Sequence, residues 1–228
     1  MVAVAEAVPS RSRTVLLAAV LDDAPALLAQ QVAALRAWLV PTDLELLGVS
    51  DPADLPVGAA DRALLSVHEQ VLGRPLEHTV TCPGCGERTT LSLARADVGE
   101  HHPRSARTGP GSGVREPTCA DVVAAHDDAS ALLRLCTVGS GGTLADLARV
   151  EGSLSGPLHS ACAGCGLPLE VDVDVVALAL GALGSVRADL DLEVHLLAAR
   201  YGWDLAVIES LPDDRRRRLA GLAAGSAP

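Results

Sequence analysis

Two short cysteine turns constrain this 228-residue chain more than any other feature of its sequence. One reads Cys82-Pro-Gly-Cys85-Gly, and the other reads Cys162-Ala-Gly-Cys165-Gly. Each spacing places both thiols of a pair at the ends of one tight turn, and the glycine that follows suits a left-handed backbone conformation. Two such turns supply four soft ligands, the tetrahedral set that structural zinc prefers. We therefore predict one Zn²⁺ held by Cys82, Cys85, Cys162 and Cys165.

The same ligand set argues against catalysis by the metal. Four thiolates would fill the coordination sphere and leave no open position for a substrate or an activated water. A thioredoxin-like redox role needs one cysteine pair, not two matched pairs that are each followed by glycine. Free thiols without a metal remain the plain alternative. We expect a structural metal and no enzymatic activity.

The remaining cysteines and one histidine pair carry no comparable pattern. Cys119 and Cys136 lack a partner at ligand spacing, and Cys136 lies among leucines, which favours a small core residue. His101 and His102 fall in a stretch rich in glycine, proline and serine, where a solvated loop is the expected setting. The sequence assigns none of these four residues a function.

Charge and hydropathy limit the classes of partner. The formal net charge is −11, whereas a surface that binds nucleic acid needs clustered Lys or Arg. No apolar run approaches the roughly 20 residues that cross a bilayer. Paired Cys-x-x-Cys turns in such a chain favour metal over disulfides. We expect a cytoplasmic protein that binds no nucleic acid, no membrane and no small-molecule substrate.

The hydrophobic fraction is 49% and consists almost entirely of Ala, Leu and Val, which predicts a mainly α-helical α+β protein. Alternating residues flank each cysteine turn, so each turn is expected at the tip of a hairpin, and together the hairpins form a zinc ribbon. The expected organisation is a flexible leader (1–13), an N-terminal helical region (14–75), the first zinc-ribbon hairpin (76–98), a loop plus helical insertion (99–157), the second hairpin (158–175) and a C-terminal helical region (176–224).

Individual elements follow from periodicity and capping residues. Strands are expected at Leu76–Thr81 and 89–93 around the first turn, and at 167–175 after the second. Residues 99–117 are expected to be a mobile loop. Helices are expected at 25–39, 61–72, 118–136, 143–150, 175–183, 188–201, 204–211 and 213–224.

The C-terminal segment has a recognisable order of motifs. A helix containing Glu193-Val-His195-Leu-Leu-Ala leads to a Tyr201-Gly-Trp203 turn, a short apolar helix and an arginine run at 215–218. This order resembles the C-terminal end of the T4-type phage baseplate hub and baseplate assembly proteins, which also occur in phage-like contractile injection systems. Many bacterial members of that family carry two Cys-Pro-x-Cys-Gly-like turns separated by a helical insertion. The lead-in from Leu55 is similar too, so the resemblance spans about residues 50–222.

The resemblance implies a baseplate assembly factor, chaperone-like or structural, or a minor component of the hub. Its partners would be baseplate or hub proteins of a contractile tail, and the protein would be assembled with the phage-tail-like particle. Candidate partner-binding residues are Tyr201 and Trp203, because aromatic side chains are frequent interface anchors, and Arg215 and Arg216, as an electrostatic patch for an acidic assembly partner. The alternative for the aromatics is packing of the last helices, and for the arginines a solvated helix face. The alternative function is a nucleic-acid- or transcription-associated zinc-ribbon protein.

Overall fold

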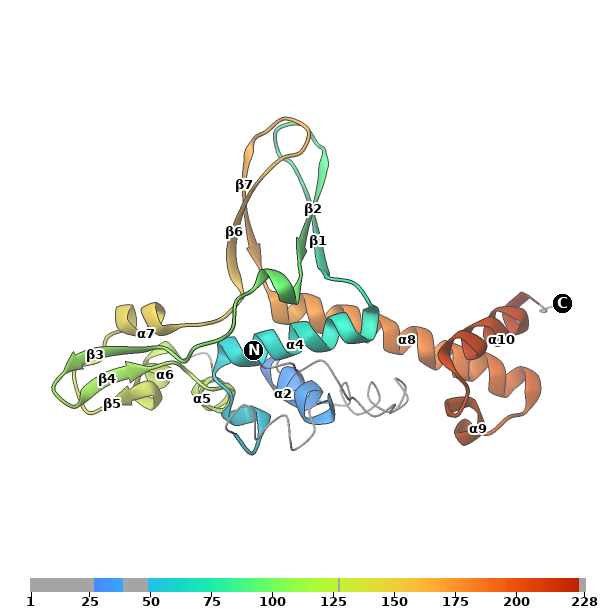
Figure 1. The fold of residues 1–228 in the computed structure, drawn as a ribbon, viewed down its shortest axis with the longest axis horizontal. Coiled ribbons are helices and arrows are strands. Elements are labelled where there is room, and N and C mark those ends of the chain that lie inside the picture. The colour runs from blue at the N-terminus through green and yellow to red at the C-terminus, as the bar shows by residue number, and fades with distance from the viewer. Residues whose placement is uncertain (1–26, 39–48, 127, 226–228) are drawn as a thin grey trace.

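The structure is a computed structural model that describes residues 27–38, 49–126 and 128–225 (Figure 1). It is a mixed α+β fold in which helices predominate and the sheets are small and antiparallel. Among the described residues, no helix has the length and apolar character needed to cross a bilayer. The predicted leader (1–13) lies outside the described residues.

A helical body lies at the centre of the molecule. It consists of α2 (Leu27–Trp38), α4 (Val57–Leu72) and the first half of the long helix α8 (Val175–Tyr201). The short 3₁₀ helix η1 (Pro52–Asp54) lies just before α4 in the chain. Gly73 ends α4 in the left-handed conformation, as its position after the apolar stripe predicts. The core of this body is built mainly from leucine and valine, including Leu35, Leu64, Leu65, Leu180 and Leu183.

Helix α4 begins four residues before its predicted start at residue 61. The first backbone amides of a helix have no intrahelical acceptor. In α4, residues far along the chain supply acceptors for two of these amides. The Val57 amide donates to the Pro117 carbonyl at 3.0 Å, and the Gly58 amide donates to the Glu116 side chain at 3.1 Å. Because these acceptors lie far along the chain, local sequence gives no sign of them.

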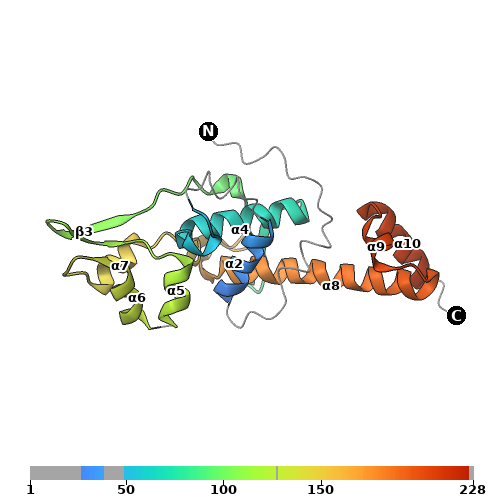
Figure 2. The same ribbon diagram turned by 90° about the horizontal axis from the view of Figure 1, so that it is seen from below.

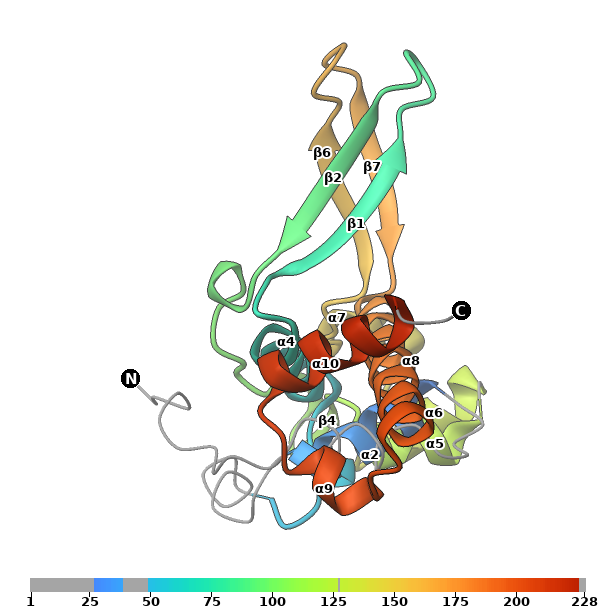
Figure 3. The ribbon, with the colours of Figure 1, turned by 90° about the vertical axis from the view of Figure 1, so that its right-hand side faces the viewer.

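Two hairpins stand side by side and project from the helical body as one arm (Figures 1 and 3). The first pairs β1 (Leu76–Thr81) with β2 (Arg88–Leu93), and the second pairs β6 (Gly156–Ala161) with β7 (Pro168–Val173). Each hairpin is a separate two-stranded sheet. Their bases join the body's core through Leu76 and Val173. The bounds predicted for the strands at 76–81, 89–93 and 167–175 agree with those of β1, β2 and β7 to within about two residues.

The insertion between the hairpins is a small domain with its own core. The prediction of a mobile loop at 99–117 is wrong, because β3 (Ser105–Gly109) and β4 (Ser112–Arg115) form a hairpin there. A third strand, β5 (Thr137–Val138), pairs with β4. The turn between β3 and β4 uses Gly111 at φ +69°, so this glycine belongs to a tight turn between paired strands and not to a mobile loop. Buried side chains of this domain include Val114, Cys136, Leu147 and Val150.

The helix expected over 118–136 is in fact two helices, α5 (Cys119–Ala125) and α6 (Ala129–Cys136), followed by α7 (Leu144–Val150). His126 ends α5 in the left-handed conformation at φ 47°. Asp128 then caps α6 by accepting from the Ser130 amide at 2.8 Å. We call residues 99–155 the inserted domain.

Helix α8 is continuous where two helices (175–183 and 188–201) were expected. Its first half is buried in the body, and its second half extends beyond the body to the C-terminal helices (Figure 2). There α9 (Leu205–Glu209) and α10 (Asp213–Gly225) pack against the end of α8. Buried Leu197, Ile208 and Ala220 form the core of this C-terminal unit (residues 190–225). The chain between the two expected helices has no Pro to stop the helix.

Candidate metal centre

Each cysteine turn closes with the same pair of backbone hydrogen bonds. In the first turn the Cys82 amide donates to the Glu87 carbonyl at 2.8 Å, and the Gly86 amide donates to the Cys82 carbonyl at 2.9 Å. Gly86 has φ +75° and its counterpart Gly166 has φ +73°, a conformation that favours glycine. The second turn repeats both bonds at 2.8 and 2.9 Å, from Cys162 to Leu167 and from Gly166 to Cys162.

The four cysteines predicted as ligands meet at the tip of the arm. Their sulfur atoms all lie within 4.8 Å of one another. The Sγ atoms of Cys82 and Cys165 are 3.7 Å apart, and those of Cys85 and Cys162 are 3.6 Å apart, so sulfurs from different hairpins are in contact. All six cysteines lie among the described residues, and none forms a disulfide. The four sulfurs therefore form one cluster that is compatible with a metal site.

Backbone amides point at two of the sulfurs. The Gly84 amide donates to Cys82 Sγ at 3.4 Å, and the Gly164 amide donates to Cys162 Sγ at 3.4 Å. Hydrogen bonds to a charged group favour its charged form, so this geometry favours thiolates. The turns also face each other closely, since a Cβ added at Gly84 would lie 3.1 Å from Leu167 Cδ2.

The pKa values of two of the clustered cysteines show that four thiolates here would need a compensating positive charge. Backbone amides of Cys165 and Gly164 lower the pKa of Cys162 to about 6. The Glu87 amide lowers the pKa of Cys85, but the neighbouring sulfurs of Cys165 and Cys162 outweigh it and raise that pKa to about 12. Four sulfurs this close cannot all ionise without a compensating charge, whereas a bound divalent cation would deprotonate all four. The residues present therefore fit a tetrahedral metal ion.

This arrangement suits a structural role. Cys82 and Cys162 are buried, whereas Cys85 and Cys165 are exposed at the tip. A metal held by all four sulfurs would join two hairpins that share no backbone hydrogen bond. With four protein ligands it would have no open coordination position.

The other two cysteines are core residues. Cys119 and Cys136 are both fully buried. Burial raises the pKa of Cys119 to about 12 and that of Cys136 to about 11, so both stay as neutral thiols. Cys136 packs with Leu132 and Leu133, as its leucine-rich surroundings predict.

The candidate partner-binding residues divide into exposed and buried ones. The rings of Tyr201 and Trp203 stack with centroids 5.0 Å apart. Tyr201 is 40% exposed, whereas Trp203 is half-buried against the core of the C-terminal unit. Arg215 is exposed. Arg216 is 1% exposed, so the expectation of a solvated face at residues 215–218 is wrong for this residue.

Arg216 is held inside the C-terminal unit by two carboxylates. Its Nε lies 2.9 Å from Glu193 Oε2 on α8, and its Nη2 lies 2.8 Å from Asp213 Oδ1. The sequence showed the nearby Asp213, but Glu193 is 23 positions away, so local pattern could not show which arginine of the run turns inward. Arg216 thus stabilises the packing of α10 on α8.

The solvated setting expected for His101 is also wrong. Its side chain is 10% exposed and faces the buried carboxylate of Glu116. Sequence reasoning gave no role to Glu116, which lies in no motif, or to Arg62, which was seen only as part of the lead-in from Leu55. The exposed neighbour His102 agrees with the expectation.

Comparison with known proteins yields no relative from which a role could be transferred. The chain matches no family model, no curated protein and no solved structure.

Proposed function

We propose that this chain is a zinc-stapled, non-catalytic assembly factor or minor hub component of the baseplate of a phage tail or phage-like contractile injection system. The observation that supports it most is the convergence of Cys82, Cys85, Cys162 and Cys165 across an inserted domain. That convergence agrees with the order of motifs by which the sequence resembles the baseplate family. The proposed metal is zinc, and the two hairpins together form a zinc ribbon.

The metal would act as a staple at the far end of the arm. The bases of both hairpins are fixed in the core of the helical body, whereas toward their tips the hairpins share a small cluster of Cys82, Cys162 and Leu169. An isolated two-stranded hairpin is at best marginally stable in water. Zinc would therefore supply much of the free energy that keeps the arm ordered.

The C-terminal unit is the proposed surface for baseplate or hub proteins. It exposes Tyr201 together with two apolar residues of α9, Leu205 at 54% and Val207 at 46%. Arg215 adds an exposed cation nearby in sequence. In this proposal Tyr201 and Arg215 contact the partner, while Trp203 supports Tyr201 by stacking and Arg216 fixes the helix that presents Arg215.

The alternative of a nucleic-acid-binding zinc ribbon has less support. Such a ribbon needs basic and aromatic side chains on its surface. The arm instead exposes carboxylates at Glu77, Glu87, Glu170 and Asp172. These charges would repel a phosphate backbone.

The metal is tested by elemental analysis of the purified full-length chain together with a count of reactive thiols. We expect one zinc per chain with four protected cysteines. The double variant C82S/C165S should lose the metal, whereas the control C119A should keep it, because Cys119 is buried away from the cluster. A wild-type chain that contains no metal after expression with zinc would overturn the zinc staple.

The baseplate role is tested in the native host. Deletion of the gene should give particles with incomplete baseplates, seen by negative-stain electron microscopy. The wild-type gene should restore them, and a Y201A/R215A double variant should restore them poorly while still binding zinc. Complete, normal baseplates after deletion would exclude the assembly role.

A further inference from the structure

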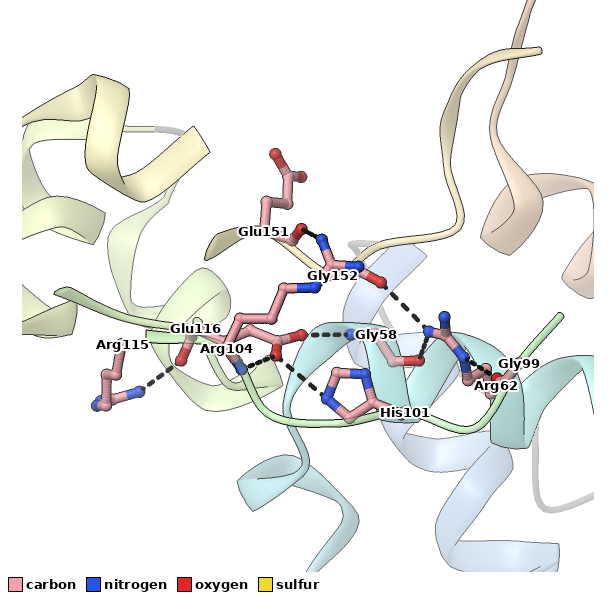
Figure 4. Close-up of polar contacts among 9 residues, drawn as sticks. All are labelled: Gly58, Arg62, Gly99, His101, Arg104, Arg115, Glu116, Glu151 and Gly152. Atoms are coloured by element: carbon pink, nitrogen blue, oxygen red, sulfur yellow. Dashed lines mark hydrogen bonds and ion pairs between the residues drawn. The ribbon is translucent and has the colours of Figure 1, made fainter. Parts of the chain in front are cut away.

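The inserted domain meets the helical body at a buried polar joint, which we define as Gly58, Arg62, His101, Glu116 and Gly152 (Figure 4). Arg62 on α4 binds both segments that connect the domain to the rest of the chain. Its Nε donates to the Gly99 carbonyl at 2.9 Å, and its Nη1 donates to the carbonyls of Gly58 and Gly152 at 2.7 and 3.3 Å. One guanidinium therefore ties the outgoing and returning segments to the same helix.

Glu116 provides the second tie from the side of the inserted domain. Its side chain is 2% exposed. Oε1 accepts from the Gly58 amide in the first turn of α4 at 3.1 Å, and Oε2 accepts from the Arg104 amide at 3.3 Å. Carboxylates are favourable at a helix N-terminus, and this hydrogen bond from the Gly58 amide holds the start of α4 against the inserted domain.

The joint is too tightly packed to admit another side chain. A Cβ at Gly58 would collide with the carbonyl oxygen of Gly152, and a Cβ at Gly152 would collide with Glu116 Oε1. A charge that forms inside such a joint cannot be hydrated unless the two parts separate.

His101 is the group in this joint that titrates near neutral pH. Its Nε2 lies 3.1 Å from Glu116 Oε2. Burial lowers the pKa of His101; the Glu116 carboxylate opposes this, and the nearby cations Arg62 and Arg104, with His102, lower the pKa further. Burial and two guanidinium groups thus outweigh one carboxylate, and the imidazole is neutral in the closed joint at neutral pH.

We propose that acid opens this joint, with His101 as the group whose protonation releases the inserted domain from α4. An opened joint exposes the imidazole to water, where it binds a proton more readily than in the closed joint. The closed joint is therefore fully stable above the ordinary histidine pKa of about 6.5 and loses stability as the pH falls below it. Each unit by which the closed joint lowers the pKa allows about a tenfold increase in the open population.

The test is backbone hydrogen exchange, read by mass spectrometry on the full-length metal-loaded chain at about pH 7.5 and about pH 5.5, with intrinsic rates corrected. Peptides that cover residues 57–62, 99–105 and 151–155 should exchange faster at the lower pH. The variant H101N should remove this pH dependence. The matched control H102N changes the exposed neighbouring histidine and should behave as the wild type.

Two further measurements distinguish opening of the joint from loss of the metal and from general unfolding. Peptides from the hairpin tips should keep their protection at both pH values, because loss of metal would release those first. Nuclear magnetic resonance titration should place the pKa of His101 below the ordinary histidine value of about 6.5. The proposal is overturned if the joint peptides show no dependence on pH, if H101N keeps the wild-type dependence, or if the hairpin tips open first.

Discussion

At the scale of single residues, substitution of Arg216 is the most direct test of whether buried ion pairs stabilise the C-terminal unit. Replacing it by Met keeps much of the apolar stem but leaves Glu193, whose side chain is 14% exposed, without its main partner. Removing one member of a buried ion pair costs about 3 kcal/mol or more. We expect R216M to lower the opening free energy of α10 by about that amount, measured by hydrogen exchange of residues 213–225.

The matched control for that experiment is R218M. Arg218 is exposed, and surface substitutions of this kind usually change stability by about 0.5 kcal/mol or less. If R216M and R218M have equal effects on exchange in α10, the buried ion pairs do not stabilise the unit.

Sequence reasoning succeeded for residues whose chemistry is local. The four clustered cysteines were identified because each pair and its glycine lie within one turn. It failed for His101 and Arg216, whose burial depends on Glu116 and Glu193 in other elements. A titratable side chain is buried only where a distant partner compensates it, so local pattern cannot identify which member of a polar run turns inward.

At the scale of elements, the start of α4 depends on a close contact between two glycines. G58A should destabilise the chain, because the new methyl group would collide with the backbone of Gly152, which cannot rotate away. Overpacking of this kind typically costs about 1–3 kcal/mol. The expected result is a lower thermal unfolding midpoint and faster exchange in the first turn of α4.

The control for this prediction is the same change in open space. Gly181 lies within α8, and a Cβ there meets nothing within 4 Å. G181A should stabilise the helix by up to about 1 kcal/mol, because alanine is the better helix former. A G58A chain that is as stable as the wild type would show that the glycine contact does not hold α4 against the inserted domain.

The errors in element assignment have a common physical cause. The hairpin of β3 and β4 was missed because Pro110 and Gly111 occur in turns as well as in mobile loops. The break between α5 and α6 was missed because it rests on His126 adopting a left-handed conformation that few non-glycine residues take. Turn residues mark where the chain changes direction, but only tertiary pairing decides whether strands flank the turn.

At the scale of the whole molecule, the broad class was predictable and the separate core of the inserted domain was not. The bias to Ala, Leu and Val gave a mainly helical α+β fold, as observed. The independent cluster around Val114 and Leu147 was not expected, since residues 99–117 of that segment, which include Val114, were assigned to a loop. The long span between the cysteine pairs is therefore a folded body and not a flexible tether.

This arrangement predicts how the molecule responds to metal removal. The core of the helical body includes the hairpin bases but none of the four clustered cysteines, and Cys82 and Cys162 lie in a separate small cluster with Leu169. Chelation should therefore release the tips and leave the helices folded. We expect the far-ultraviolet helical signal to be nearly unchanged, while exchange rises in peptides covering residues 80–90 and 160–170.

How much of the chain unfolds without metal depends on which parts of the fold zinc alone keeps together. Cys85 and Cys162 are 77 positions apart, and closing a flexible loop of that length would cost several kcal/mol of chain entropy. The inserted domain is folded and tied to α4 by Arg62 and Glu116, so the hairpin bases are already held close together before metal binds. Zinc then needs to order only the tips, and C82S/C165S should keep a folded body with disordered hairpin tips. Cooperative loss of the whole helical signal on chelation would instead show that the metal holds the entire molecule together.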